Sequence, residues 1–403
     1  MRRVYIHVGL PKTGTSYVQK SLQASKGRLS EAGVLVPGDD PQFQRRAVWD
    51  LLGRRLQGVD HPDVPGAWQA LVASVVEGQG DRAVLSEELL VHAGRRVAQR
   101  VVRDLAPAEV HIIVTVRDLA RVLASMWQQQ MAKRRTWPWP VFVAAVGDPK
   151  RGPSTAGVAF WLRYDLHRTL ATWASVVPAH RIHVVVVPEA GSAPSVLLER
   201  FAAAADLNPA LLTAPDRLAN TSVGMVGAEL LRRVNLGLGQ RLNESQYLHV
   251  VHAIKHELRR HSGGPIPLPR EARGWVNEAS TAVTTLLKDG PYDVVGDLDD
   301  LLPATAWEAD AKRAPVTDRQ LADVAIAALT VVAEKYGDTW SNTRNRKRGS
   351  KADRRTRLSS SARSLAFRSR VRALNAADSN QYLARAAAWY LRRSAGGGPR
   401  VPH

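Results

Sequence analysis

The chain has 403 residues, of which 45% are hydrophobic, and it carries a formal net charge of +19 and no cysteine. Without cysteine it can form neither a disulfide framework nor a thiolate metal site. Its length suffices for one large α/β domain with additions. The first apolar run is too short for a signal peptide, and no stretch approaches the roughly 18 uninterrupted apolar residues of a membrane-spanning helix. We therefore expect a soluble, cytoplasmic protein.

The positive charge is concentrated near the C-terminal end. Residues 341–403 contain 16 Lys and Arg but only 2 Asp and Glu, a net charge of +14, which leaves +5 for residues 1–340. A body with so small an excess lacks the basic surface expected of a specific nucleic-acid-binding domain. The tail favours instead a peripheral contact with an anionic membrane, at the inner membrane face.

Short β-branched runs alternate with helical patterns in the first half of the chain. This alternation predicts an α/β fold: a P-loop-like parallel sheet flanked by helices, with a helical C-terminal extension. Buried strands are expected at 4–8, 82–86, 110–116 and 181–187. Helices are expected from residue 16 onward and at 95–105, 118–132, 223–238, 246–261, 271–288 and 320–335. A long loop is expected at 137–157, which begins Trp-Pro-Trp-Pro and continues rich in Gly, Pro and Ser.

The segment after the first expected strand has the composition of a phosphate-binding loop. Gly9 and Gly14 allow a tight turn, and the N–H groups at the start of the following helix favour an anion there. The glycines fit the Walker pattern G-x-x-x-x-G-K-[ST], but Thr15 stands where that pattern has lysine. The lysine lies earlier, at Lys12, so the arrangement on which nucleoside-triphosphate kinases rely is missing.

This loop resembles the one that holds the 5′-phosphosulfate in sulfotransferases that use PAPS (3′-phosphoadenosine-5′-phosphosulfate). The residues that carry the resemblance are Pro11, Lys12, Thr13, Gly14, Thr15 and Ser16. It implies that Lys12 contacts the bridging oxygen of PAPS and stabilises the charge that develops on the leaving phosphate. The backbone of residues 13–16 and the hydroxyls of Thr15 and Ser16 would surround that phosphate. No metal is required, because the lysine and the helix N–H groups can neutralise the leaving group.

A second motif resembles the site where this family binds the 3′-phosphate. Arg117 ends the third expected strand, where ligands of open α/β sheets bind, and its guanidinium can hold a phosphate with two hydrogen bonds. Ser125 lies eight residues later, about two turns into the next helix. The alternatives are a capping pair of Arg117 with Asp118, and a packing role for Ser125 in a helix interface.

Sulfo transfer also needs a group that takes the proton of the acceptor. Glu87 and Glu88 follow the second expected strand, and their position resembles that of the general base in the branch of the family that uses glutamate. We assign Glu88 as the base, with Glu87 as its substitute; alternatively, both form the acidic first turn of a helix. His92 and His111 are weaker candidates, and His111 lies inside a strand.

Two further sets of residues have simpler interpretations. Three precede the helix expected at 223–238: Arg217, Asn220 and Ser222. They resemble a motif of some bacterial sulfotransferases, but capping of the helix explains them as well. Four are histidines: His249, His252, His256 and His261. A solvated helix face is favoured over a zinc site for these.

The chain is thus expected to hold a sulfotransferase domain over 1–340 and a basic tail over 341–403. The domain comprises an α/β nucleotide-binding core (1–215) and a mainly helical part (216–340). The tail is expected to be partly disordered, with the pattern of a short amphipathic helix at 382–391. The expected reaction moves a sulfo group from PAPS to a hydroxyl or amine of a carbohydrate, lipid or secondary metabolite. The alternatives are a P-loop-type kinase or NTPase, and a nucleic-acid- or membrane-binding protein that works through its tail.

Overall fold

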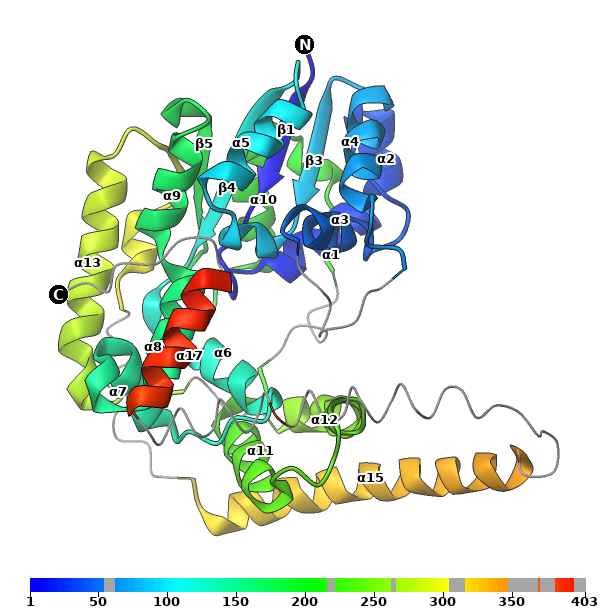
Figure 1. The fold of residues 1–403 in the computed structure, drawn as a ribbon, viewed down its shortest axis with the longest axis vertical. Coiled ribbons are helices and arrows are strands. Elements are labelled where there is room, and N and C mark those ends of the chain that lie inside the picture. Colours follow the sequence, from blue (N-terminus) through cyan, green and yellow to red (C-terminus); the bar gives the residue numbers. More distant parts are fainter. Residues whose placement is uncertain are drawn as a thin grey trace.

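A six-stranded parallel sheet forms the centre of the computed structural model, which describes residues 1–53, 62–215, 222–261, 266–303, 316–346, 369 and 381–394 (Figure 1). The strand order is β2-β3-β1-β4-β5-β6, and every neighbouring pair is parallel. The strands are β1 (Arg3–His7), β2 (Val34–Leu35), β3 (Arg82–Ser86), β4 (Glu109–Val116), β5 (Ile182–Val186) and β6 (Asp293–Val295). The expected α/β, P-loop-like sheet flanked by helices is confirmed.

Helices cover both faces of this sheet, because successive side chains of a strand point to opposite faces. One face, which carries Tyr5 and Ile113, packs against three helices: α1 (Thr15–Ala24), α2 (Lys26–Glu31) and α10 (Pro194–Ala204). The other face, which carries Ile6 and Ile112, packs against α3 (Phe43–Leu51), α4 (Ala67–Glu77), α5 (Arg95–Asp104) and α9 (Leu166–Ala174). Burial on both faces explains why the central strands are almost wholly apolar.

The four strands expected from the sequence are confirmed to within about a residue at each end. The expected loop at 137–157 is wrong in most of its length. It contains α7 (Trp139–Gly147) and the start of α8 (Ser154–Tyr164). Pro140 falls in the first turn of α7, where proline removes no helical hydrogen bond, so it starts the helix and does not prevent it.

Further helices lie beyond the end of the sheet at which the strands finish (Figure 1). They are α6 (Leu119–Ala132), α11 (Gly224–Leu238), α12 (Glu244–Arg260) and α15 (Asp318–Arg346). Helix α11 packs against α6, α12 and α15, and α12 also packs against α15. Helix α13 (Arg273–Asp289) contacts α6 and leads into the edge strand β6.

The C-terminal region contains two helices in its described part. Helix α15 continues past residue 335, where the sequence pattern ends, to Arg346. Helix α17 (Gln381–Ser394) confirms the helix expected at 382–391 and packs against α8. The rest of the tail, including most of the segment expected to be disordered, lies outside the described residues.

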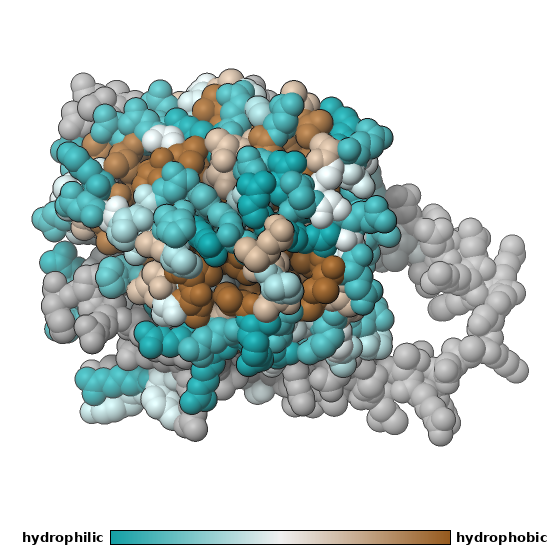
Figure 2. Space-filling model, turned by 90° about the horizontal axis from the view of Figure 1, so that it is seen from above, coloured by the Kyte–Doolittle hydropathy of each residue, from teal (hydrophilic) through white to brown (hydrophobic). Residues whose placement is uncertain are grey.

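No helix in the described ranges is both long and apolar enough to cross a membrane. Figure 2 shows the surface at the end of the sheet where the strands begin. Hydrophilic residues cover much of it, with apolar residues gathered between them.

Candidate active site

The loop between β1 and α1 takes its shape from three residues with left-handed backbone. Gly9, Lys12 and Gly14 have φ values of 97°, 70° and 90°. A Cβ on Gly14 would lie 2.6 Å from Cδ2 of Leu197, and one on Gly9 would lie 3.4 Å from Cβ of Glu88. The two glycines therefore let α10 and the segment after β3 approach the loop closely. Lys12 carries a side chain, so its left-handed φ is a strained backbone conformation. Such strain is common at functional sites.

A buried polar chain beneath the loop ties it to the sheet. Nδ1 of His7 lies 2.8 Å from Oγ of Ser86, and its Nε2 lies 3.1 Å from Oγ1 of Thr115. Thr115 contacts the hydroxyl of Thr13, which donates to the carbonyl of Leu10. Because the hydroxyl of Thr13 donates to Leu10, it must accept from the hydroxyl of Thr115. Thr115 in turn accepts from His7, which therefore carries its proton on Nε2, and Nδ1 of His7 accepts from Ser86. Burial lowers the pKa of His7 to about 3, which keeps the ring neutral.

This chain limits the role of Thr13 and was missed in the sequence. The hydroxyl of Thr13 is buried in the chain, so only its backbone can face a ligand. The sequence feature that could have revealed this polar chain is the position of His7 inside an apolar strand, because a buried imidazole needs hydrogen-bond partners.

The start of α1 offers its backbone N–H groups to an anion. Among the described residues no side chain caps this helix, whose N-cap is Gly14. The first N–H groups of a helix carry partial positive charge and lack partners within the helix. Ser16 is exposed here, whereas Thr15 is buried and donates a 2.8 Å hydrogen bond to Oε2 of Glu88. The hydroxyl of Thr15 thus connects Glu88 to the loop.

Lys12 lies in a strongly cationic environment. Burial lowers its pKa to about 8, and the positive charges of Lys255, Arg117 and Lys133 act in the same direction. The carboxylate of Glu88 opposes them. An anion bound beside Lys12 would relieve this unfavourable charge and raise the pKa of Lys12 again.

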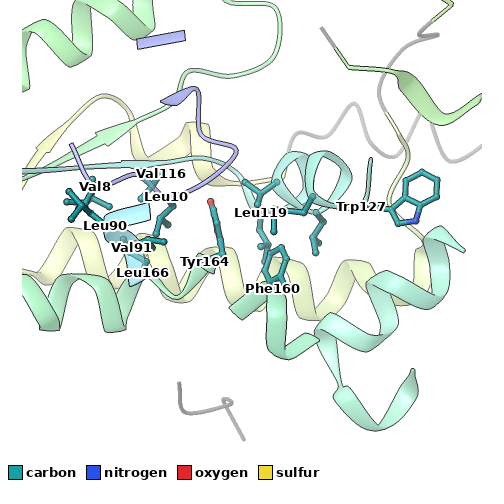
Figure 3. Packing of buried hydrophobic residues seen from close by; sticks show 14 of the residues in the cluster. Val8, Leu10, Leu90, Val91, Val116, Leu119, Trp127, Phe160, Tyr164 and Leu166 are labelled. Carbon is teal, nitrogen blue, oxygen red and sulfur yellow. The ribbon is translucent and has the colours of Figure 1, made fainter. Parts of the chain in front are cut away.

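Arg117 follows the end of β4, the strand expected before it, and lies against the loop. Its Nη1 donates to the carbonyl of Lys12 at 3.2 Å, and its backbone exchanges two hydrogen bonds with the hydroxyl of Tyr164, which points toward the loop in Figure 3. Its Nε is buried and has no hydrogen-bond partner in the described part of the chain. Burial lowers the pKa of Arg117 to about 10. The alternative pairing with Asp118 is not seen: Asp118 caps α6 by accepting from the backbone and side chain of Arg121.

Ser125 is half-buried in α6, but no hydrogen bond joins it to Arg117, both residues being described. One turn further, Gln128 accepts hydrogen bonds from the hydroxyl of Ser222 and the backbone of Gly224. Ser222 in turn accepts from the backbone of Gly224, the first residue of α11, whose N-cap is Val223. The other two residues of that set, at positions 217 and 220, lie outside the described residues.

The other candidate bases are in less suitable positions. Glu87 is 4% exposed, pairs with Arg45 at 3.3 Å and accepts from the backbone of Leu89. Burial raises its pKa, and Arg45 opposes this shift. His92 is buried. His111 lies in the first half of β4, where it pairs with Tyr5 in the middle of β1, well before the strand ends that carry the loop. Of the candidates, Glu88 alone is hydrogen-bonded to the loop.

Sequence reasoning missed two lysines whose positive charges act on Lys12, and an arginine whose charge acts on one of these lysines. Lys133 follows α6, and Lys255 and Arg259 belong to α12. Burial lowers the pKa of Lys133 and of Lys255, and the charges of Arg163 and Arg259, respectively, add to the effect. The residue Lys133 is nevertheless exposed. No local pattern could have placed α12 beside the loop, because the contact joins segments about 240 residues apart.

Comparisons with known proteins identify no relative. No family model matches the chain, and no curated protein or solved structure matches it. Within the described ranges, no group of three or more His, Asp or Glu side chains is arranged to hold a metal ion. The four histidines of α12 and its C-cap are all exposed.

Proposed function

We propose that this protein transfers a sulfo group from PAPS to an acceptor hydroxyl or amine. The observation that carries the proposal is the convergence of three chemically different groups on one loop. Lys12 belongs to the loop, Arg117 donates to its backbone, and Glu88 is hydrogen-bonded to Thr15. They come from the ends of three adjacent strands, β1, β4 and β3, which is where open parallel sheets bind ligands.

In the proposed reaction the acceptor oxygen attacks sulfur as the bond from sulfur to the bridging oxygen of PAPS breaks. The electron pair of that bond stays on the leaving nucleotide, PAP (3′,5′-bisphosphoadenosine). Lys12 and the N–H groups at the start of α1 stabilise the charge on this leaving group. Glu88 takes the proton of the acceptor. The bond from Thr15 holds the Glu88 carboxylate beside the loop before the substrates bind.

Arg117, which follows β4, is proposed to hold the 3′-phosphate together with Ser125 of the next helix, α6. A buried guanidinium with an unused N–H supports this assignment, since it could donate more hydrogen bonds than it makes in the free protein. A P-loop kinase or NTPase would need a carboxylate at this strand end and a lysine at position 15, where this chain has Arg117 and Thr15.

Calorimetry with PAP and with ADP, without added metal, tests the proposal. PAP should bind at least about tenfold more tightly, because a charge-assisted hydrogen bond to the 3′-phosphate contributes free energy that ADP cannot supply. Arg117→Gln should remove this preference. Arg96→Gln, which neutralises an exposed arginine of α5, should preserve it. Tighter binding of ADP, or an unchanged preference in Arg117→Gln, would refute the assignment.

A further inference from the structure

Helix α17 packs against α8 with its smallest side chains (Figure 1). Ala388 forms a buried cluster with Val158 and Leu162 of α8. Ala384, one turn earlier on the same side of α17, is also buried. The contact attaches α17 to the fold and covers apolar side chains of α8, but the side of α17 that it buries consists of alanines.

The opposite side of α17 carries its large apolar side chains toward solvent. Tyr382 is 70% exposed, Leu383 46% and Trp389 60%. Tyr382 and Trp389 lie seven residues, or two turns, apart on one side of the helix, and Arg385 and Ala386 between them are exposed as well. We call these five residues the aromatic face of α17. Burial of an aromatic ring stabilises a fold more than burial of a methyl group, so packing within the chain does not account for this face.

The charge around the aromatic face is positive. The 14 residues of α17 include three arginines and no acidic residue, and residues 341–403 as a whole carry a net charge of +14. A second copy of the chain would bring the same positive charge, which disfavours it as the partner of this face. An anionic partner is favoured instead.

The side chains of the aromatic face suit an anionic lipid surface. Trp and Tyr combine an apolar ring with a polar group, and they are enriched where hydrocarbon meets water. A basic helix with Trp, Tyr and Leu together on one face is typical of helices that lie in the plane of a bilayer surface. Nucleic acid would also attract the arginines, but it offers no hydrocarbon to the exposed Leu383.

We propose that α17 is a membrane-docking helix, whose aromatic face enters the headgroup region of a bilayer that contains anionic lipid. Arg385 on this face binds lipid phosphates. Few apolar side chains take part, so binding also needs the charge of the surrounding tail, each cation near the surface strengthening it by about fivefold. Docking would bring the bilayer beside α8, whose last residue, Tyr164, is hydrogen-bonded to the backbone of Arg117. The inference does not depend on the proposed function.

Sedimentation of the full-length protein with lipid vesicles tests the charge requirement. The vesicles contain phosphatidylcholine alone, or phosphatidylcholine with about one third phosphatidylglycerol, which is anionic. The protein should bind the anionic vesicles at least about tenfold more tightly, and added salt should weaken this binding. Equal binding to both kinds of vesicle, or binding to neither, would overturn the inference.

Variants of exposed residues separate the aromatic face from the rest of the basic tail. Tyr382→Ser combined with Trp389→Ser should weaken binding to the anionic vesicles by about tenfold or more, because apolar area is lost. Tyr336→Ser, at a tyrosine of α15 that is 71% exposed, should leave it unchanged. Arg385→Gln should weaken it by about fivefold, and Arg96→Gln on α5 should not. Wild-type binding by the double aromatic variant would mean that the tail binds by charge alone, contrary to the proposal.

Two further measurements show whether the aromatic face itself meets the lipid. Phosphatidylglycerol with brominated acyl chains should quench the fluorescence of the wild type more than that of Trp389→Phe, since bromine quenches only nearby indoles. Equal quenching would place Trp389 outside the bilayer and refute the docking geometry. If a single-stranded oligonucleotide binds the wild type but not the double aromatic variant, while vesicles bind both alike, the face serves nucleic acid and the inference is wrong.

Discussion

At the scale of single residues, Lys12 is predicted to control how the proposed binding of PAP depends on pH. Burial lowers its pKa to about 8 in the free protein, and a bound phosphate would raise it. Below pH 8, where Lys12 is already protonated, its titration should therefore not change the affinity for PAP. Above pH 8 the affinity should fall by up to about tenfold per pH unit, because binding must then restore the proton. Calorimetry between pH 7.5 and pH 10 measures this. Lys12→Arg should move the decline to higher pH, and an identical decline in this variant would exclude Lys12 as its cause.

Glu88 is predicted to act on turnover and not on nucleotide binding. Glu88→Gln keeps the shape and the contact with Thr15 but cannot take a proton, so sulfo transfer should slow by about 10²-fold or more. PAP affinity should remain within a factor of about three, because Glu88 is not among the groups proposed to bind the phosphates. Radiolabelled sulfo transfer and calorimetry provide the two measurements. If turnover is retained, the base lies elsewhere.

The residues of the loop could be predicted because their order is local, from Pro11 to Ser16. The positions of Arg117 and Glu88 at the edge of the sheet could be predicted because each follows a recognisable strand, and strand ends of a parallel sheet meet at one edge. Lys255 could not, since its role depends on how a distant helix packs against that edge. The contact between Thr15 and Glu88 likewise required knowledge of side-chain direction, which spacing alone does not supply.

At the scale of elements, the approach of α10 to the loop predicts a large difference between two glycines. Gly14→Ala places a Cβ 2.6 Å from Leu197 at a φ of 90°, so it should destabilise the fold by roughly 1–3 kcal/mol. Gly27→Ala lies in α2 with nothing within 4 Å, and it should stabilise by roughly 0.5–1 kcal/mol. Urea denaturation of the two variants gives both values. Equal effects would show that α10 does not pack against the loop.

Helices and strands could be predicted where the hydrophobic pattern extended over many residues without interruption. The mostly apolar β4 and the amphipathic helices of the second half met this condition. The edge strands β2 and β6 did not, because they have two and three residues and pair on one side only. Prolines misled the interpretation of α7, since a proline in the first turn of a helix resembles a loop signal in sequence.

At the scale of the whole molecule, the two parts of the chain meet around one cationic site. The α/β core supplies the loop, Arg117 and Glu88, and the helical part supplies Lys255, whose charge acts on Lys12. Composition predicted a mildly basic body but could not show that several of its cations converge. The strong charge of residues 341–403 obscured this, because a net charge carries no information about position.

The stability of the whole protein should depend on pH because His7, beneath the loop, stays neutral. The pKa of His7 is lowered from 6.5 to about 3, so between these pH values the unfolded chain binds a proton that the native protein does not bind. Its contribution to stability is therefore complete above pH 6.5 and declines as the pH falls from 6.5 to 3, by up to about tenfold in the folding equilibrium per pH unit. Denaturant unfolding at several pH values in this window measures the slope.

His7→Gln should reduce that slope by one proton. It should also lower the stability at neutral pH, because the hydrogen-bonded chain from Ser86 to Thr115 is interrupted. His167→Gln removes an exposed imidazole of α9 and serves as the matched control. A slope that is the same in wild type and His7→Gln would mean that His7 binds its proton in the native protein, and the directed hydrogen bonds that hold the loop would then need a different arrangement.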